Sequence, residues 1–284
     1  MRIVGGYGIT FGGLDLQGMD EFGVSWKTNA LEDWDAPPGN TTDVVQNSFS
    51  DGGWMSPGYR EPKTVRIVGR LVAPDRPAAR AAIYRLTRVI PSVGTAVVAV
   101  SEDGTVTHRQ MKIDGAPKIP RPTDVYASFD LLLTAPASRL FSGDGSSPYQ
   151  FSASVFLPFT SGGLQLSVTA PFSIGATVVN GSVTVTAAGD APPPVLVRVN
   201  GPAVQPVIRD GDGDSMLLDI SLDAGQWLDV DLDARTIKIN STVNRRNVLR
   251  GPWIVPRAGM VLSLDAAVYD PLTSMTVFWT DASY

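Results

Sequence analysis

Helix-forming charged residues almost disappear from the second half of this chain. The 28 acidic residues comprise 24 Asp and 4 Glu, and the 23 basic residues comprise 18 Arg and 5 Lys. After residue 135 there is no Glu, and Lys238 is the only Lys. Glu and Lys typically fill helix surfaces, whereas Asp prefers turns and helix caps. With 28 Gly and 22 Pro in addition, the chain is predicted to be mainly β.

The length of 284 residues fits one large or two medium domains. Residues 135–148 are small, polar and rich in Gly and Ser, so we place the domain boundary in this stretch. We expect an N-terminal β-rich domain over residues 1–135. We expect a C-terminal β-sandwich of jelly-roll or galectin type over residues 136–284, and a second barrel is the alternative for strands at this spacing.

One helix is predicted near residues 76–90. Asp75 is a suitable N-cap, Pro77 is tolerated in the first turn, and Pro91 ends the helix. Its apolar residues form one stripe at helical spacing: Ala79, Ala82, Ile83, Leu86, Val89 and Ile90. We expect this stripe to cover one face of a sheet. The four arginines largely off the stripe leave a basic partner site open as the alternative reading.

Strand patterns dominate the rest of the chain, although the first fifty residues read as irregular. In the first half, strands are predicted over 64–73, 95–100, 105–113 and 126–134. The first of these has an apolar face with Val65, Ile67, Gly69 and Leu71 and carries Arg66 and Arg70 on the other face. In the second half, they are predicted over 164–170, 176–179, 183–187, 195–200, 203–209, 216–222, 226–232, 236–240, 260–267 and 275–280. Asn180-Gly181 is a strong hairpin signal. Residues 228–233 alternate strictly between apolar and acidic side chains. This pattern predicts a strand with a solvated face that carries Asp229, Asp231 and Asp233.

The residue types that carry most catalysis are scarce. The absence of Cys excludes disulfides, thiolate metal sites and cysteine nucleophiles. His108 is the only histidine, lies within a predicted strand where exposure is the default, and is not accompanied by a Gly-x-Ser-x-Gly motif. No cofactor, metal site or enzymatic activity is therefore expected. Paired carboxylates of a glycan hydrolase stay open, because such a pair meets only in three dimensions.

The segment Asp210-Gly211-Asp212-Gly213-Asp214-Ser215 resembles the start of a calcium loop. Ser215 stands where such a loop needs Gly, and Ser221 stands where it needs Glu. A turn between two strands is therefore the preferred interpretation, because Asp and Gly suit turn conformations.

Tryptophans are the candidate contact residues. Trp34, Trp227 and Trp253 are candidates for contacts with glycans or with other subunits. Trp34 lies between acidic residues and is the tryptophan that we expect to be most exposed. The net charge of −5 and the lack of a basic face argue against specific binding to nucleic acid.

Motifs in both halves resemble the distal tail proteins of long non-contractile-tailed bacteriophages, also called minor tail proteins. In the first half, the motifs that carry this resemblance are residues 51–53, 59–60 and 66–69 and the predicted helix. The second half contributes 179–181, 194–201, 206–208, 222–231, 235–237, 253, 256–260 and the aromatic end 277–284. The ordered series of these motifs is more specific than any one of them.

The resemblance implies a structural component of the phage tail tip. Its N-terminal β-domain would assemble into a hexameric ring, with a galectin-like sandwich outside. The ring would connect the tail tube protein to the tail-tip proteins and let DNA pass through its lumen without specific binding. A carbohydrate-binding or receptor-binding module that recognises a host-surface glycan is the alternative.

The resemblance also places the protein in the virion, at the tail tip. The first residues lack an apolar segment followed by a small-residue cleavage site, so we expect synthesis in the host cytoplasm without a signal peptide. No run of about 18 apolar residues occurs, and no membrane insertion is expected.

Overall fold

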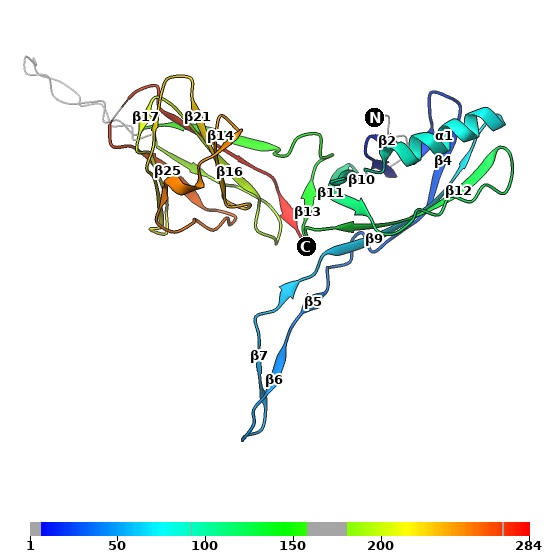
Figure 1. The fold of residues 1–284 in the computed structure, drawn as a ribbon, viewed down its shortest axis with the longest axis horizontal. Coiled ribbons are helices and arrows are strands. Elements are labelled where there is room, and N and C mark those ends of the chain that lie inside the picture. The colour runs from blue at the N-terminus through cyan, green and yellow to red at the C-terminus, as the bar shows by residue number, and fades with distance from the viewer. Residues whose placement is uncertain (1–6, 92, 158–180, 269) are drawn as a thin grey trace, which may run out of the picture. The chain divides into compact units, whose positions relative to one another are not determined.

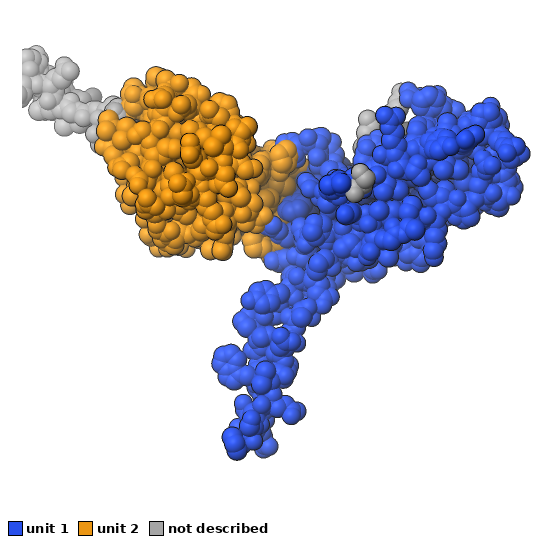
Figure 2. Space-filling model, in the orientation of Figure 1, with its two compact units in different colours: residues 1–147, 283–284 blue, residues 148–282 orange. Residues whose placement is uncertain are grey.

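The computed structural model of the chain forms two compact units, each with its own hydrophobic core (Figures 1 and 2). Unit 1 comprises Met1–Ser147 with Ser283–Tyr284, and unit 2 comprises Pro148–Ala282. The structure describes all residues except 1–6, 92, 158–180 and 269. Both units consist mainly of strands, which confirms the prediction of a mainly β protein. The strands predicted over 164–170 and 176–179, and Asn180 of the predicted hairpin, lie outside the described residues.

Unit 1 is built on a ten-stranded antiparallel sheet. Eight strands follow the order β2-β1-β10-β11-β12-β9-β4-β3, and β13 and β27 complete the sheet. Their bounds are β1 Tyr7–Phe11, β2 Leu14–Asp15, β3 Gly18–Met19, β4 Ser25–Glu32, β9 Lys63–Val72, β10 Ala96–Glu102, β11 Thr105–Ile113, β12 Tyr126–Ala135, β13 Leu140–Ser142 and β27 Ala282–Ser283. The eight-residue strand β4 lies within the stretch expected to be irregular, so that expectation was wrong.

Burial alternates along the central strands of unit 1. In β9 the odd-numbered residues are buried and the even-numbered ones face outward, as the sequence predicts. Gly69 lies opposite Phe129 of β12. A Cβ atom on Gly69 would lie 2.2 Å from the Phe129 ring, so only glycine fits beneath this aromatic side chain. The outward residues leave one face of β4, β9 and β12 available at the surface.

The predicted helix is confirmed as α1, Arg76–Val89. The Asp75 side chain accepts a hydrogen bond from the Ala78 backbone N–H at 2.7 Å, which satisfies one of the unpaired donors of the first turn. Ala79, Ala82 and Leu86 are fully buried in the unit 1 core. The apolar stripe therefore covers the sheet as expected.

A long hairpin connects β4 to β9. It contains β5 Asn40–Thr41, β6 Val44–Gln46, β7 Gly53–Met55 and β8 Tyr59–Arg60. β5 pairs with β8 and β6 pairs with β7, each as a separate two-stranded sheet. We call residues 39–62 the arm (blue, labelled β5 to β7 in Figure 1).

Unit 2 is a β-sandwich of two main antiparallel sheets, whose buried residues form a single core. The first sheet has the order β14-β26-β16-β21-β22-β23 and the second has the order β15-β25-β18-β19-β24; β17 pairs with β20. Their bounds are β14 Phe151–Phe156, β15 Ser182–Thr184, β16 Val195–Asn200, β17 Ala203–Val204, β18 Val207–Asp210, β19 Ser215–Leu218, β20 Ser221–Leu222, β21 Trp227–Asp231, β22 Thr236–Ile239, β23 Val243–Asn244, β24 Leu249–Arg250, β25 Val261–Asp265 and β26 Ser274–Trp279, with a short 3-10 helix at Arg246–Val248.

Two predicted strands of unit 2 are split in the structure. The strand expected over 216–222 becomes β19 and β20. The strand expected over 203–209 becomes β17 and β18, because Gln205 adopts a left-handed backbone conformation with φ of 44°. Pro206 follows and has no backbone N–H to donate to a strand partner. The break lets β17 pair with β20 while β18 pairs with β19 and β25.

Candidate functional site

The single histidine is a buried structural residue. The expectation that His108 is exposed was wrong, because β13 pairs beside it and its ring lies 5.7 Å from the ring of Phe141. Its Nδ1 lies 2.9 Å from the Gly143 carbonyl oxygen, to which it donates in the neutral ring. Burial lowers the pKa of His108 below its ordinary value. The neutral form is thus favoured, and the position lacks access to a substrate.

The calcium-like segment is a turn between β18 and β19, as the sequence favours. Asp210 is buried, and its carboxylate pairs with Arg257 at 2.7 Å. The same guanidinium group lies 2.6 Å from the exposed Asp212. Arg257 therefore supplies the positive charge that a metal ion would supply. Throughout the described residues, no group of three metal-ligating side chains is suitably arranged.

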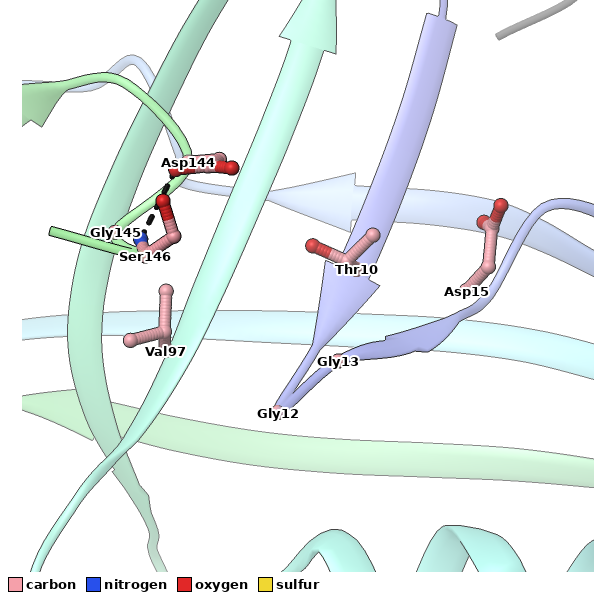
Figure 3. A pocket seen from close by; sticks show the side chains of 8 residues that line it. All are labelled: Thr10, Gly12, Gly13, Asp15, Val97, Asp144, Gly145 and Ser146. Carbon is pink, nitrogen blue, oxygen red and sulfur yellow. Dashed lines mark hydrogen bonds between the residues drawn. The ribbon is translucent and has the colours of Figure 1, made fainter. Parts of the chain in front are cut away.

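A hollow of about 470 Å³ lies on unit 1 beside the turn between β1 and β2 (Figure 3). Its polar groups include the carboxylates of Asp15 and Asp144 and the side chains of Thr10 and Ser146. Burial raises the pKa of Asp15. The Ser146 backbone N–H donates to Asp144 at 2.9 Å, so this carboxylate is used within its own turn. The residues that line the hollow include no His, Lys or Cys.

Trp34 is buried, with 3% of its surface exposed, so the expectation of exposure was wrong. Its indole N–H donates to Thr107 at 3.4 Å, and its carbonyl accepts from Arg109 at 3.4 Å. The Arg109 guanidinium also lies 5.7 Å from the Trp34 ring centroid. Burial lowers the pKa of Arg109 to about 10. Trp34 thus fixes the segment between β4 and the arm to β11 of unit 1.

Trp227 belongs to a connected polar network on unit 2. Its indole N–H donates to Ser241 at 3.1 Å, and the Ser241 hydroxyl donates to Asp229 at 2.5 Å. Arg198 binds the same carboxylate through two hydrogen bonds of 2.7 and 3.1 Å. Asp229 is buried by these partners, which corrects its assignment to a solvated acidic face.

Trp253 is half-buried and packs against the unit 2 core. The guanidinium group of Arg246 lies 6.0 Å from its ring centroid. Trp34 belongs to unit 1, whereas Trp227 and Trp253 belong to unit 2. The glycan and subunit contacts assigned to Trp227 and Trp253 stay predictions.

The most unusual surface is the arm, which sequence reasoning missed. Its large apolar side chains are exposed: Val44, Val45, Phe49, Trp54, Met55 and Tyr59. Adjacent apolar residues, as in Val44-Val45 and Trp54-Met55, place apolar groups on both faces of a hairpin. The sequence signal for this exposed hairpin is the lack of alternation between apolar and polar residues in its strands. A contiguous exposed apolar surface typically marks an interaction site.

Within the part of the chain that the structure describes, no helix has both the length and the apolar character needed to cross a bilayer. No protein-family model and no curated protein matches the chain. Solved structures do match.

The SPP1 Dit protein is described as a paradigm of the hub adsorption apparatus in phages that infect Gram-positive bacteria. It matches with a TM-score of 0.64 and 10% identity, over 97% of this chain and 98% of its own. A chain of the activated phage p2 baseplate with Sr matches with a TM-score of 0.54 and 9% identity, over 96% of this chain and 97% of its own. A chain of that baseplate with Ca gives a TM-score of 0.50, 9% identity and 98% coverage of each chain. This chain therefore has the fold of the SPP1 Dit protein and of a phage p2 baseplate protein.

Proposed function

We propose that the protein is a structural component of a phage tail tip, located in the virion. One observation supports this proposal above all. The likeness to the SPP1 Dit hub protein extends over both units and nearly the full length of both chains. A likeness restricted to one β-domain would be less informative, because one fold serves many functions. In this role the protein positions its neighbours in the tail tip and catalyses no reaction.

In this proposal, unit 1 assembles into a hexameric ring that connects the tail tube to the tip and host-adhesion proteins. DNA passes through the lumen without specific binding. The net charge of −5 is compatible with such a passage, because an acidic surface does not retain DNA. The large antiparallel sheet of unit 1 and the exposed arm provide surface for subunit contacts.

The test is the oligomeric state of the purified full-length protein. Light scattering should give the mass of a hexamer, and negative-stain microscopy should show a six-fold ring with a central hole. A strict monomer at micromolar concentration and physiological salt would argue against the ring.

A second candidate is glycan binding by unit 2, using the outer face of β16 and β21. Half-buried Trp227 lies there beside the Arg198–Asp229 pair, and sugar sites combine an aromatic ring with fixed polar groups. Calorimetry with host cell-wall glycans should then give heat that a Trp227→Ala variant loses. Equal heats from both proteins, or no heat from either, would reject this role.

A further inference from the structure

The outer face of α1 is basic and carries no acidic residue. The helix buries Ala79, Ala82 and Leu86 in the unit 1 core, and its opposite face is exposed (Figure 1). The exposed residues are Arg76, Pro77, Arg80, Ala81, Tyr84, Thr87 and Arg88. No Asp or Glu occurs anywhere in the helix. A solvated surface typically mixes charges of both signs, so a helix face with arginine as its only charged residue is unusual.

Four of these exposed residues form a row. Arg76, Arg80, Tyr84 and Arg88 follow one another at intervals of four residues, and we call them the arginine row. Side chains at this spacing lie side by side on one helix face, about 6 Å apart along the axis. Like charges four residues apart repel each other, and Arg76 in the first turn faces the positive end of the helix dipole. Arg76 and Arg80 therefore do not stabilise the helix in the isolated chain.

The arginine row has few partners within the chain. Arg76 lies 3.5 Å from Asp124 in an exposed ion pair, and such pairs are weak. Arg80 donates to the Tyr84 hydroxyl through Nε and Nη2, at 3.2 and 3.1 Å. Arg88 is exposed and forms no hydrogen bond or ion pair in the part of the chain that the structure describes. The row thus presents a fixed Arg–Tyr pair and two guanidinium groups, those of Arg80 and Arg88, that lack a carboxylate.

The composition of this face fits a protein partner. Arg and Tyr are enriched in protein interfaces and among the residues that dominate binding energy, whereas Lys and Glu are depleted there. Tyr84 is 57% exposed within the row. Nucleic acid is less suitable, because the chain carries a net charge of −5 and long-range repulsion opposes the approach of a polyanion.

Small residues beside the arginine row favour a helix as the contacting element. Pro77 and Ala81 form the neighbouring row of the exposed face. Helices pack by placing a ridge of side chains from one helix in a groove of the other, and small residues leave room for such a ridge. Carboxylates four residues apart on a facing helix recur at the same interval as the arginines. Each guanidinium group can then bind a carboxylate through two parallel hydrogen bonds.

We propose that the arginine row binds an acidic helix of another tail-tip protein. Among the described residues α1 is the one α-helix, and it has no carboxylate. The described part of a second copy therefore does not supply this partner. The inference rests on the proposed function for the class of partner, and it assigns the contact surface to α1.

Peptide binding to the full-length protein tests the chemistry of the contact. The probe is a fluorescent, end-capped, alanine-based helical peptide with Glu at every fourth residue, and its matched control carries Gln at the same positions. In fluorescence anisotropy the Glu peptide should bind about tenfold more tightly than the Gln peptide, and high salt should weaken its binding. Equal affinities for the two peptides would overturn the proposal.

Two double variants locate the binding surface. Arg80→Gln combined with Arg88→Gln should weaken binding of the Glu peptide about tenfold. The matched control combines Arg70→Gln and Arg121→Gln, which remove two exposed arginines elsewhere on unit 1 and change the net charge equally. This control should bind as the wild type does. Equal losses in the two double variants would overturn the proposal, because they would show attraction by net charge alone.

A short DNA duplex provides the competing ligand. It should bind more weakly than the Glu peptide at physiological salt. Tighter binding of the duplex that is lost on Arg80→Gln with Arg88→Gln would replace the acidic helix by nucleic acid.

Arginine modification in assembled tails tests the origin of the partner. Phenylglyoxal should modify Arg80 and Arg88 in the purified protein, and isolated tails should protect both. The same tails unfolded in urea give the full reaction of each arginine for reference. Full reaction of both arginines in intact tails would overturn the contact.

The oligomeric state separates this inference from the proposed function. Wild-type rings that do not bind the Glu peptide would overturn the helix contact and leave the proposed function standing. A wild-type monomer that binds the peptide would overturn the ring and leave the arginine row as a binding surface. A ring that is lost on Arg80→Gln with Arg88→Gln would replace the acidic helix by a second copy of the chain.

Discussion

At the scale of single residues, the burial of His108 makes the free energy of unfolding depend on pH. Burial lowers its pKa below the ordinary value, despite the hydrogen bond to Gly143. The folded state therefore binds a proton less readily than the unfolded state. The contribution of His108 to stability is complete above its unfolded pKa of about 6.5. This contribution is lost as the pH falls from that value through the folded pKa.

We predict that the single histidine signal in the NMR spectrum titrates below the value measured in urea. The free energy of unfolding should fall between about pH 7 and about pH 5. A His108→Gln variant should show a smaller fall over the same interval. A folded pKa at or above the unfolded value would contradict this prediction.

Arg257 provides the second prediction at this scale. It is the ion-pair partner of buried Asp210, and a buried carboxylate left without a partner is costly. Arg257→Ala should lower the free energy of unfolding by about 1–3 kcal/mol in urea denaturation. Asp212→Asn is the control, because this exposed partner should contribute less than about 1 kcal/mol. Equal losses in the two variants would contradict the assignment.

At the scale of the elements, the helix is defined by local chemistry. Asp75 caps α1 through the Ala78 backbone N–H. Asp75→Ala should lower the free energy of unfolding by about 1 kcal/mol, whereas Asp75→Ser keeps an acceptor and should lose less. Thermal melting of the full chain compares the two variants. If Ala and Ser have the same effect, the cap contributes no specific stability.

The strands show which burial patterns the local sequence predicts and which it does not. The alternation in β9 predicts which residues are buried, because its period of two follows from backbone geometry. The same rule places Asp229 on a solvated face, yet it is buried by Arg198 and Ser241. Partners that are distant in the sequence decide how much of a strand face is exposed.

At the scale of the molecule, the two separate cores suggest separate folding. The unit 2 core contains residues from both of its main sheets and is independent of the unit 1 core. We predict that residues 148–282 alone unfold in one cooperative thermal transition and give a dispersed NMR spectrum. A gradual transition with a collapsed spectrum would show that unit 2 needs the rest of the chain.

The sequence by itself determined the mainly β class, the helix and its Asp75 cap, and the buried face of β9. These features depend on propensity, periodicity and capping, which act between residues close in the chain. Tertiary structure alone decided that Trp34 is buried and that the arm is exposed. The acidic neighbours of Trp34 suggest exposure, but its partners Thr107 and Arg109 lie more than seventy residues away. Burial is set by such long-range contacts, which local sequence does not contain.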